Sequence, residues 1–307
     1  MTIPSRRHFL GTAAAAALAG CCTMTAPRKT GAIDAHVHVW TRDTDRYPLK
    51  PGAKKADVMK PPSFTPDELM AHARPQGVDR VVLIQMSFYG HDNTYMLDTI
   101  AAAPKTYVGV ALVDETAADL PAHLKALRAR GVRGIRITPG RQSAGPWLES
   151  KTMARLWQEA TDAGLAICPL INAIALPALH QMCKRFPRTT VVIDHFARIG
   201  VYGKVMDSDV DDLCRLEKFP GVHVKTSAFY ALGKKQLPYD DLAPMILRLV
   251  EIYGPERLMW ASDCPFQVNA PHTYAASIDV IRSRVQLLKP ADRDWLLRGT
   301  AEKVFFA

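Results

Sequence analysis

Eight short, continuously apolar runs alternate with helix patterns along most of the 307-residue chain. The runs are rich in Val and Ile, as is typical of strands that are buried on both faces of a parallel sheet. Strand-then-helix units in this number predict a single-domain α/β protein with a (β/α)8 TIM barrel. The predicted strands are residues 33–39, 80–86, 107–112, 132–138, 165–171, 190–195, 222–227 and 257–263.

A doubly wound open sheet is the alternative interpretation of the same alternation. Such a sheet commonly carries a Gly-rich phosphate loop after its first strand, whereas residues 40–64 of this chain are polar and contain four prolines. This difference favours the barrel, which we place at residues 31–307. Because prolines oppose regular structure, we expect residues 40–64 to form an extended loop over the barrel mouth.

Helices are predicted between the strands, and the first of them has a recognisable start. Thr65-Pro66-Asp67-Glu68 combines an N-cap residue, a proline at the first helical position and a Glu that can complete a capping box. We expect this helix to end before Pro75. The other helices are predicted at roughly 93–103, 117–130, 149–163, 175–186, 208–218, 240–253 and 273–287.

Residues 1–26 have the pattern of an export signal followed by a short linker. Ser5-Arg6-Arg7-His8-Phe9-Leu10 resembles a twin-arginine signal, and the apolar run after it is too short to span a bilayer. Leu18-Ala19-Gly20-Cys21 resembles a bacterial lipobox, which predicts a lipid anchor at Cys21. We therefore expect the twin-arginine export machinery and the membrane as partners, and a position on the periplasmic side. A soluble periplasmic protein is the alternative.

The charge balance bears on possible partners. The chain has 39 basic and 30 acidic side chains, a net charge of +9. The Lys and Arg residues are scattered, with no basic arm, aromatic stripe or Cys/His finger spacing, so we do not expect nucleic acid as a partner. A small-molecule substrate is the alternative that the remaining motifs support.

Four chemically suited residues fall at the ends of predicted strands, where the active site of such a barrel lies. His36 and His38 end the first strand and share one face because they are two residues apart. His195 ends the sixth strand and Asp263 the eighth. Imidazoles and a carboxylate can bind a divalent metal such as Zn or Mn, which would activate a water molecule, and the carboxylate can accept its proton. The pattern predicts a hydrolytic site.

At these residues the chain resembles the amidohydrolase superfamily, and within it the amidohydrolase-related branch that contains sugar lactonases and 2-pyrone-4,6-dicarboxylate lactonase. The resemblance spans residues 33–306, and its motifs include DAHVHVW, GVRGIRI, FPRTTVVIDH, VHVKTSAFY and RLMWASDCPF. It implies that the protein opens a lactone, with Asp263 as general base beside the first-strand pair His36 and His38 and the sixth-strand His195.

The resemblance also implies which residues face the substrate. Arg136, Lys225 and Ser227 would line the mouth, where cations can hold a carboxylate or lactone oxygens. An anionic or polyhydroxylated lactone is the expected substrate. Three further residues are predicted to contact it, although the last of them could equally cap a helix: Asn172, Tyr89 and Asn93.

One departure from the family pattern concerns the fifth strand, where many metal-dependent members carry a His and this chain has Cys168-Pro169. With His36, His38 and Asp263 as ligands, a metal would be weakly held or absent. Asp263 could then activate water alone while an imidazole or a nearby Arg stabilises the oxyanion, which favours lactones over amides. A metal-dependent decarboxylase of an aromatic or enoic acid and a catalytically silent envelope protein that binds a sugar acid are the alternatives.

Overall fold

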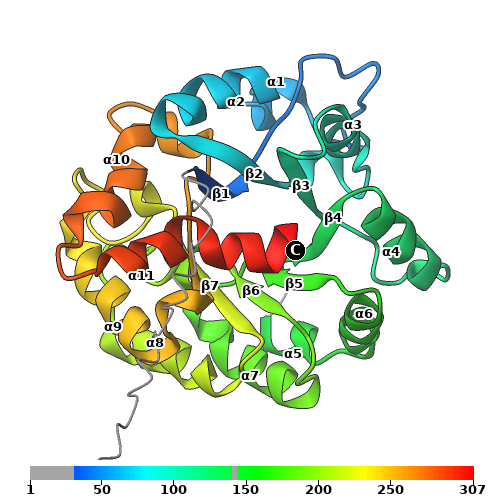
Figure 1. Cartoon of the computed structure of the whole chain (residues 1–307). Coiled ribbons are helices and arrows are strands. Elements are labelled where there is room, and N and C mark those ends of the chain that lie inside the picture. Colours follow the sequence, from blue (N-terminus) through cyan, green and yellow to red (C-terminus); the bar gives the residue numbers. More distant parts are fainter. Residues whose placement is uncertain (1–30, 140–143) are drawn as a thin grey trace, which may run out of the picture. The chain divides into compact units, whose positions relative to one another are not determined.

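Consecutive strands pair in parallel in the order in which they occur along the chain (Figure 1). This arrangement is seen in a computed structural model that describes residues 31–139 and 144–307. Each predicted apolar run overlaps one strand, so the prediction of an eight-stranded parallel barrel is confirmed. The strands are β1 (Ala32–Val37), β2 (Val78–Ile84), β3 (Tyr107–Ala111), β4 (Val132–Ile137), β5 (Ala166–Pro169), β6 (Val191–Ile193), β7 (Val222–Ser227) and β8 (Leu258–Ala261).

Helices surround the barrel (Figure 1). Within the part of the chain that the structure describes, none is long and apolar enough to cross a membrane. The helices are α1 (Lys55–Val58), α2 (Pro66–Ala73), α3 (Thr94–Ala102), α4 (Leu120–Ala129), α5 (Ala144–Leu148), α6 (Lys151–Asp162), α7 (Leu176–Arg185), α8 (Asp207–Cys214), α9 (Ala243–Tyr253), α10 (Tyr274–Asp279) and α11 (Pro290–Asp294).

The start of α2 is confirmed as predicted, and the preceding loop is corrected. Thr65 and Glu68 form both halves of a capping box at the first turn of α2. The segment 40–64 is not extended throughout, because it contains α1 and its two ends, Trp40 and Phe64, pair in an antiparallel bridge. Trp40 is fully buried and Phe64 is nearly so, and this burial offsets the unfavourable local preference of the prolines.

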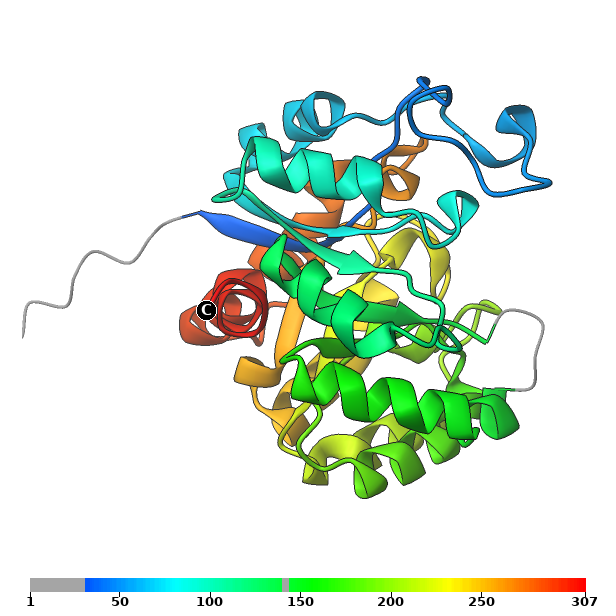
Figure 2. The same cartoon turned by 90° about the vertical axis from the view of Figure 1, so that its right-hand side faces the viewer.

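Two apolar clusters hold the barrel together. The larger packs the helices against the outside of the strands. The smaller takes alternate residues from six strands and fills the interior, with Phe305 from a π-helical turn at Glu302–Phe306 that the sequence analysis did not predict. This C-terminal segment lies at the end of the barrel where β1 begins (Figure 2). The interior cluster comprises Ile33, Ala35, Val82, Ile84, Val108, Val110, Ala166, Cys168, Val192, Met259, Ala261, Ala301 and Phe305.

A bulge in β1 allows two consecutive residues, Ala35 and His36, to face the barrel interior. The register with β2 passes from Asp34↔Val81 to Val37↔Leu83, so β1 has one extra residue between these pairs. Asp34 Oδ1 accepts a hydrogen bond from the His36 backbone N–H at 3.2 Å, which removes that donor from the sheet ladder. The local contact explains why the side chains of both Ala35 and His36 lie inside the barrel.

Asp34 also joins the first strand to the last. Its Oδ1 accepts from the Ser262 backbone N–H at 2.8 Å, and its Oδ2 accepts from the Tyr274 hydroxyl at 2.7 Å. Beyond it, the Asp263 N–H donates to the His36 carbonyl and the His38 N–H donates to the Cys264 carbonyl, both at 2.9 Å. The backbone segments that carry the predicted site residues are therefore bonded directly to each other.

Asp34→Asn tests the contribution of this buried carboxyl group. Burial raises the pKa of Asp34 to about 6. Because the pKa is raised on folding, the carboxyl stabilises the fold fully below about pH 4 and loses this stabilisation as the pH rises through about 6. The free energy of unfolding of the wild type minus that of the variant should therefore fall by up to about 3 kcal/mol between about pH 4 and about pH 7.

Urea titrations at a series of pH values measure this difference. Asn keeps the shape and one acceptor oxygen, so the comparison isolates the titration of Asp34 from that of other groups. A difference that does not change with pH, or that increases with pH, would contradict the prediction.

Candidate active site

The carboxyl ends of β1, β6 and β8 bring three predicted site residues together. Nitrogen atoms of His36 and His195 and an oxygen of Asp263 lie within 4.8 Å of one another, and all three residues are buried. His38 belongs to the same group, because its Nε2 is 3.3 Å from Asp263 Oδ1 and 3.3 Å from His36 Nε2. The four residues predicted to be catalytic thus form one cluster.

The contacts of the two β1 histidines direct their Nε2 atoms toward Asp263. His38 Nδ1 is 2.8 Å from the Ile84 carbonyl and can only donate to it, so Nδ1 carries a hydrogen and Nε2 is the ring nitrogen that faces Asp263. His36 Nε2 lies 3.5 Å from Asp263 Oδ1. Burial, followed by the charge of Lys225, lowers the pKa of His36 well below its ordinary value, so this ring is neutral. Two imidazole nitrogens and a carboxylate oxygen therefore converge.

Asp263 is held in its ionised form. Burial raises the pKa of this carboxyl, but the facing imidazoles, His195 foremost, outweigh burial and bring it below its usual value. The Tyr230 hydroxyl donates a hydrogen bond of 2.7 Å to Asp263 Oδ2, leaving Oδ1 directed at His36 and His38. Asp263 is thus an ionised carboxylate in a buried site.

Asp194 supplies a second buried negative charge directly below this cluster. It is fully buried, and its Oδ1 lies 3.0 Å from Lys225 Nζ and 3.2 Å from His36 Nδ1. Arg136 Nε is 3.8 Å from its Oδ2. Although burial raises the pKa of Asp194, the Lys225 charge and the other neighbours hold it well below the usual range. The ion pair with Lys225 also places the ammonium 3.1 Å from His36 Nδ1.

His195 follows β6 in an unusual backbone conformation. Its φ is 52°, and the next three residues to Arg198 have φ values of 54–56°. Non-glycine residues in this region cost about 1–3 kcal/mol each, and such strain is concentrated at functional sites. The turn places His195 Nδ1 2.8 Å from Ser227 Oγ and Nε2 3.8 Å from Asp263 Oδ2. Asp263 itself has a φ of 65°.

The residues predicted to contact substrate fall into two groups. Arg136 lies beside the cluster with 11% of its side chain exposed, whereas Lys225 and Ser227 are fully buried beneath it. Asn172 follows β5, and its buried Oδ1 has no hydrogen-bond partner among the described residues. Two others make contacts away from the cluster: Tyr89 accepts from the Thr41 N–H, and Asn93 bonds to both backbone groups of Leu112. Their roles as substrate contacts stay predictions.

Sequence reasoning missed several residues on which the site depends. Asp194 stands next to His195 in the motif VVIDH, and a carboxylate after a buried strand was a usable indication of an interior charge. Tyr230 closes the motif VHVKTSAFY, but its hydrogen bond to Asp263 joins β7 and β8 and has no local sequence pattern. The same is true of the contact between Asp34 and Tyr274.

The residues present fit a divalent cation. The convergence of acceptor atoms from His36, His38 and Asp263 is the donor set that a borderline metal prefers, and His195 offers a further nitrogen. Many metal-dependent members of the family carry a histidine on β5, whereas this chain has Cys168, which is fully buried. Burial raises the pKa of its thiol to about 12, so it is a neutral thiol rather than a thiolate ligand.

In parallel barrels, imidazoles and a carboxylate at the carboxyl ends of the strands are typical of enzymes whose active site can hold a metal ion. The chain belongs to the amidohydrolase family, whose model matches residues 33–307. The crystal structure of an amidohydrolase from Burkholderia multivorans with bound zinc has the same fold, with a TM-score of 0.75 at 20% identity. The match covers 90% of this chain and 99% of that one.

Three curated relatives act on lactones or a pyrone, according to their names. An L-fucono-1,5-lactonase from Burkholderia ambifaria is 28% identical over 247 residues, which cover 78% of this chain and 82% of that protein. A 4-sulfomuconolactone hydrolase from Rhizobium radiobacter is 28% identical over 240 residues, 76% of each chain. A 2-pyrone-4,6-dicarboxylate hydrolase from Comamonas testosteroni is 28% identical over 247 residues, 76% of this chain and 77% of its own. The predicted resemblance is confirmed at the level of the family.

Lys225→Met tests the buried ion pair under the cluster. The substitution leaves the Asp194 carboxylate buried beside a neutral side chain, so the free energy of unfolding should fall by about 3–5 kcal/mol. Adding Asp194→Asn removes the uncompensated charge and should recover more than half of the loss. Guanidinium titrations measure both, with Lys234→Met as an exposed control. A single variant as stable as the control would show that Asp194 is compensated by other groups.

Proposed function

We propose that the protein is a hydrolase that opens a lactone with water activated by Asp263. The observation that carries this proposal is the ionised Asp263 carboxylate facing imidazoles from β1 and β6 at the carboxyl end of the barrel. A carboxylate held ionised can take a proton from water at neutral pH. The names of the relatives support an ester in a ring as the bond that is broken.

The proposed reaction uses the residues as follows. Asp263 takes a proton from water while the water oxygen bonds to the lactone carbonyl carbon, and the carbonyl oxygen becomes an oxyanion. His195 donates a hydrogen bond from Nε2 to that oxyanion, because the Ser227 hydroxyl can donate to its Nδ1. The bond from this carbon to the ring oxygen then breaks, and the ring oxygen receives the proton from Asp263. The product is a hydroxy acid.

A divalent cation would be held by His36, His38 and Asp263, with His195 as a further donor. When bound, it would polarise the substrate carbonyl and lower the pKa of water. Tyr230 positions Asp263 by donating to Oδ2. Because His36 could bind the cation only through a lone pair on Nε2, its Nδ1 would carry the hydrogen and donate to Asp194 Oδ1, which is paired with Lys225.

The charges of the site support an anionic substrate. Asp194 and Asp263 contribute two negative charges, and Lys225 and Arg136 contribute two positive charges. The cluster is therefore close to neutral on its own and would become positive with a divalent cation. Arg136 lies beside Asp194 at the edge of the cluster and is partly exposed, so it is the group we assign to a substrate carboxylate or hydroxyls. Lys225 is fully buried and acts in this proposal through its ion pair with Asp194.

We also propose that the protein is exported by the twin-arginine route and anchored through Cys21 on the periplasmic side of the membrane. The support is the sequence of residues 1–26, which lies outside the described residues. The catalytic proposal does not depend on it.

Asp263→Asn tests the base. The amide cannot accept a proton, so kcat for lactone opening should fall by about 10³-fold or more. Proton release during hydrolysis of aldono-, urono- and pyrone lactones provides the assay. Asp207→Asn, at the exposed start of α8, is the matched control and should keep full activity. Wild-type protein without turnover on any lactone, or a variant as active as the control, would overturn the proposed function.

Chelation tests the cation. Because β5 offers no histidine ligand, we expect the metal to be weakly held, so dialysis against a chelator should remove both bound metal and activity, and Zn or Mn should restore both. Elemental analysis of the protein is the second readout, and His38→Ala should lower the metal content. Full activity in metal-free protein would leave Asp263 as the base and reject the metal.

A further inference from the structure

The inward face of β7 is polar along its whole length. Ser227 and Lys225 lie at and below the candidate active site, and His223 lies two residues nearer the start of the strand. Interior positions of such barrels are usually filled by branched apolar side chains, as they are here on β2 and β3. His223 is 7% exposed and takes no part in the Asp263 cluster. A buried polar side chain at this end of the barrel calls for its own explanation.

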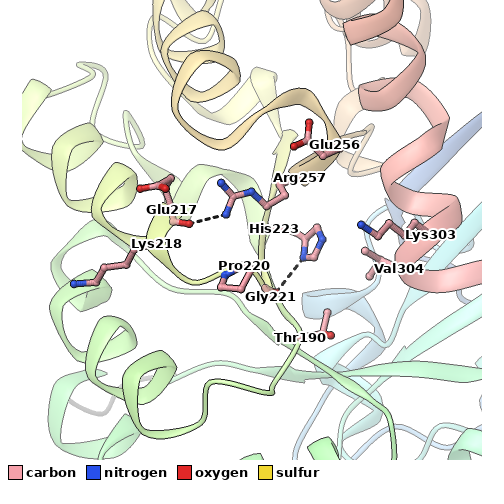
Figure 3. A pocket seen from close by; sticks show the side chains of 10 residues that line it. All are labelled: Thr190, Glu217, Lys218, Pro220, Gly221, His223, Glu256, Arg257, Lys303 and Val304. Carbon is pink, nitrogen blue, oxygen red and sulfur yellow. Dashed lines mark hydrogen bonds between the residues drawn. The ribbon is translucent and has the colours of Figure 1, made fainter.

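His223 opens into a pocket of about 770 Å³ near the starts of β6, β7 and β8. The C-terminal segment that carries Phe305 forms one wall of the pocket, so the pocket lies at the end of the barrel opposite Asp263. Figure 3 shows the side chains around it. The lining residues are Thr190, Glu217, Lys218, Pro220, Gly221, His223, Glu256, Arg257, Lys303 and Val304.

The imidazole of His223 presents an acceptor to this pocket. Its Nδ1 is 3.1 Å from the Gly221 carbonyl and must donate to it. Burial, with smaller contributions from the charges of Lys303 and Arg257, lowers the pKa of His223 to about 4. The ring is therefore neutral at pH 7, and its Nε2 carries a lone pair. A weaker contact with the Val191 backbone opposes this fall in pKa. Among the described residues, no hydrogen bond of 3.5 Å or less to Nε2 is formed.

Lys303 and Arg257 line the pocket together with this acceptor, as do Glu217 and Glu256. The Lys303 ammonium points toward the His223 ring, whereas the Lys218 ammonium and the Glu217 carboxylate point away from it (Figure 3). No carboxylate of the described residues lies within 4.0 Å of the Lys303 ammonium. The Arg257 guanidinium points toward the Glu217 carbonyl (Figure 3) and is held by bonds to the Tyr253 and Glu217 carbonyls at 2.7 and 2.6 Å, which are neutral partners.

We propose that this pocket binds a small oxyanion that carries a hydroxyl hydrogen, such as hydrogenphosphate. The ligand hydroxyl donates to His223 Nε2, and the negative oxygens face Lys303 and Arg257. An anion without such a hydrogen would place an oxygen lone pair against the Nε2 lone pair, which is unfavourable. The site should therefore distinguish phosphate from sulfate, two anions of the same shape.

Isothermal titration calorimetry of the purified protein at pH 7 and constant ionic strength tests this site with inorganic phosphate and sulfate as probes. Phosphate should bind at least about tenfold more tightly than sulfate, which corresponds to about 1.4 kcal/mol and to one hydrogen bond gained. His223→Phe should abolish this preference, because it fills the same space without an acceptor. Lys303→Met should weaken both anions.

The controls separate this site from the candidate active site. Lys151→Met removes an exposed cation at the start of α6 and should change neither affinity. Asp263→Asn should likewise leave phosphate binding intact. Equal affinities for phosphate and sulfate, an unchanged affinity in Lys303→Met, or loss of phosphate binding in Asp263→Asn would each overturn the proposal. Because Lys303 is exposed, its variant tests the site even if His223→Phe does not fold.

Free phosphate and a phosphate ester share this chemistry, and a third probe distinguishes them. Glycerol phosphate replaces one phosphate oxygen with an alkoxy group and is mostly without a hydroxyl hydrogen on phosphorus at pH 7. Weaker binding of the ester than of inorganic phosphate supports the free anion as the ligand. Tighter binding of the ester would overturn the assignment of the His223 contact to a phosphate hydroxyl.

Discussion

The need to compensate the buried Asp194 carboxylate constrains the rest of the site. A charge with no exposure to solvent is strongly unfavourable unless opposite charges and donors surround it. Lys225 from β7, Arg136 from β4 and His36 from β1 supply them. One carboxylate on β6 therefore ties together four strands. It also fixes which edge of the His36 ring is turned toward Asp263, because Nδ1 is occupied on the opposite side.

The second constraint acts on the backbone rather than on charge. Regular alternation along β1 would point Ala35 and His36 to opposite faces. The Asp34 carboxylate prevents this by bonding the His36 N–H, and it holds β8 at the same time through Ser262. The bulge is thus part of barrel closure. It delivers two histidines to the interior directly above an apolar layer, so the polar cluster rests on packed side chains and not on a cavity.

The sequence was sufficient for the features that depend on local pattern. Apolar runs located all eight strands, and the two-residue spacing of His36 and His38 placed both rings on one face. It was not sufficient where a contact joins distant segments. The bond from Tyr230 to Asp263, the bulge imposed by Asp34 and the left-handed turn at His195 arise from tertiary packing that overrides local preference. The short helix α1 within a proline-rich segment has the same origin.

Except along β7, apolar side chains separate the polar groups at the two ends of the barrel, which limits how these groups can influence each other. Phe305 is the described link, because its ring lies 5.7 Å from Lys225 Nζ and two residues from Lys303. A ligand on Lys303 would hold this C-terminal segment in place. It would alter the Asp263 cluster only if Lys225 had a second arrangement of similar energy, and the ion pair with buried Asp194 opposes any such arrangement. Occupancy of the His223 pocket should therefore raise the stability of the barrel while leaving the chemistry at its other end unchanged.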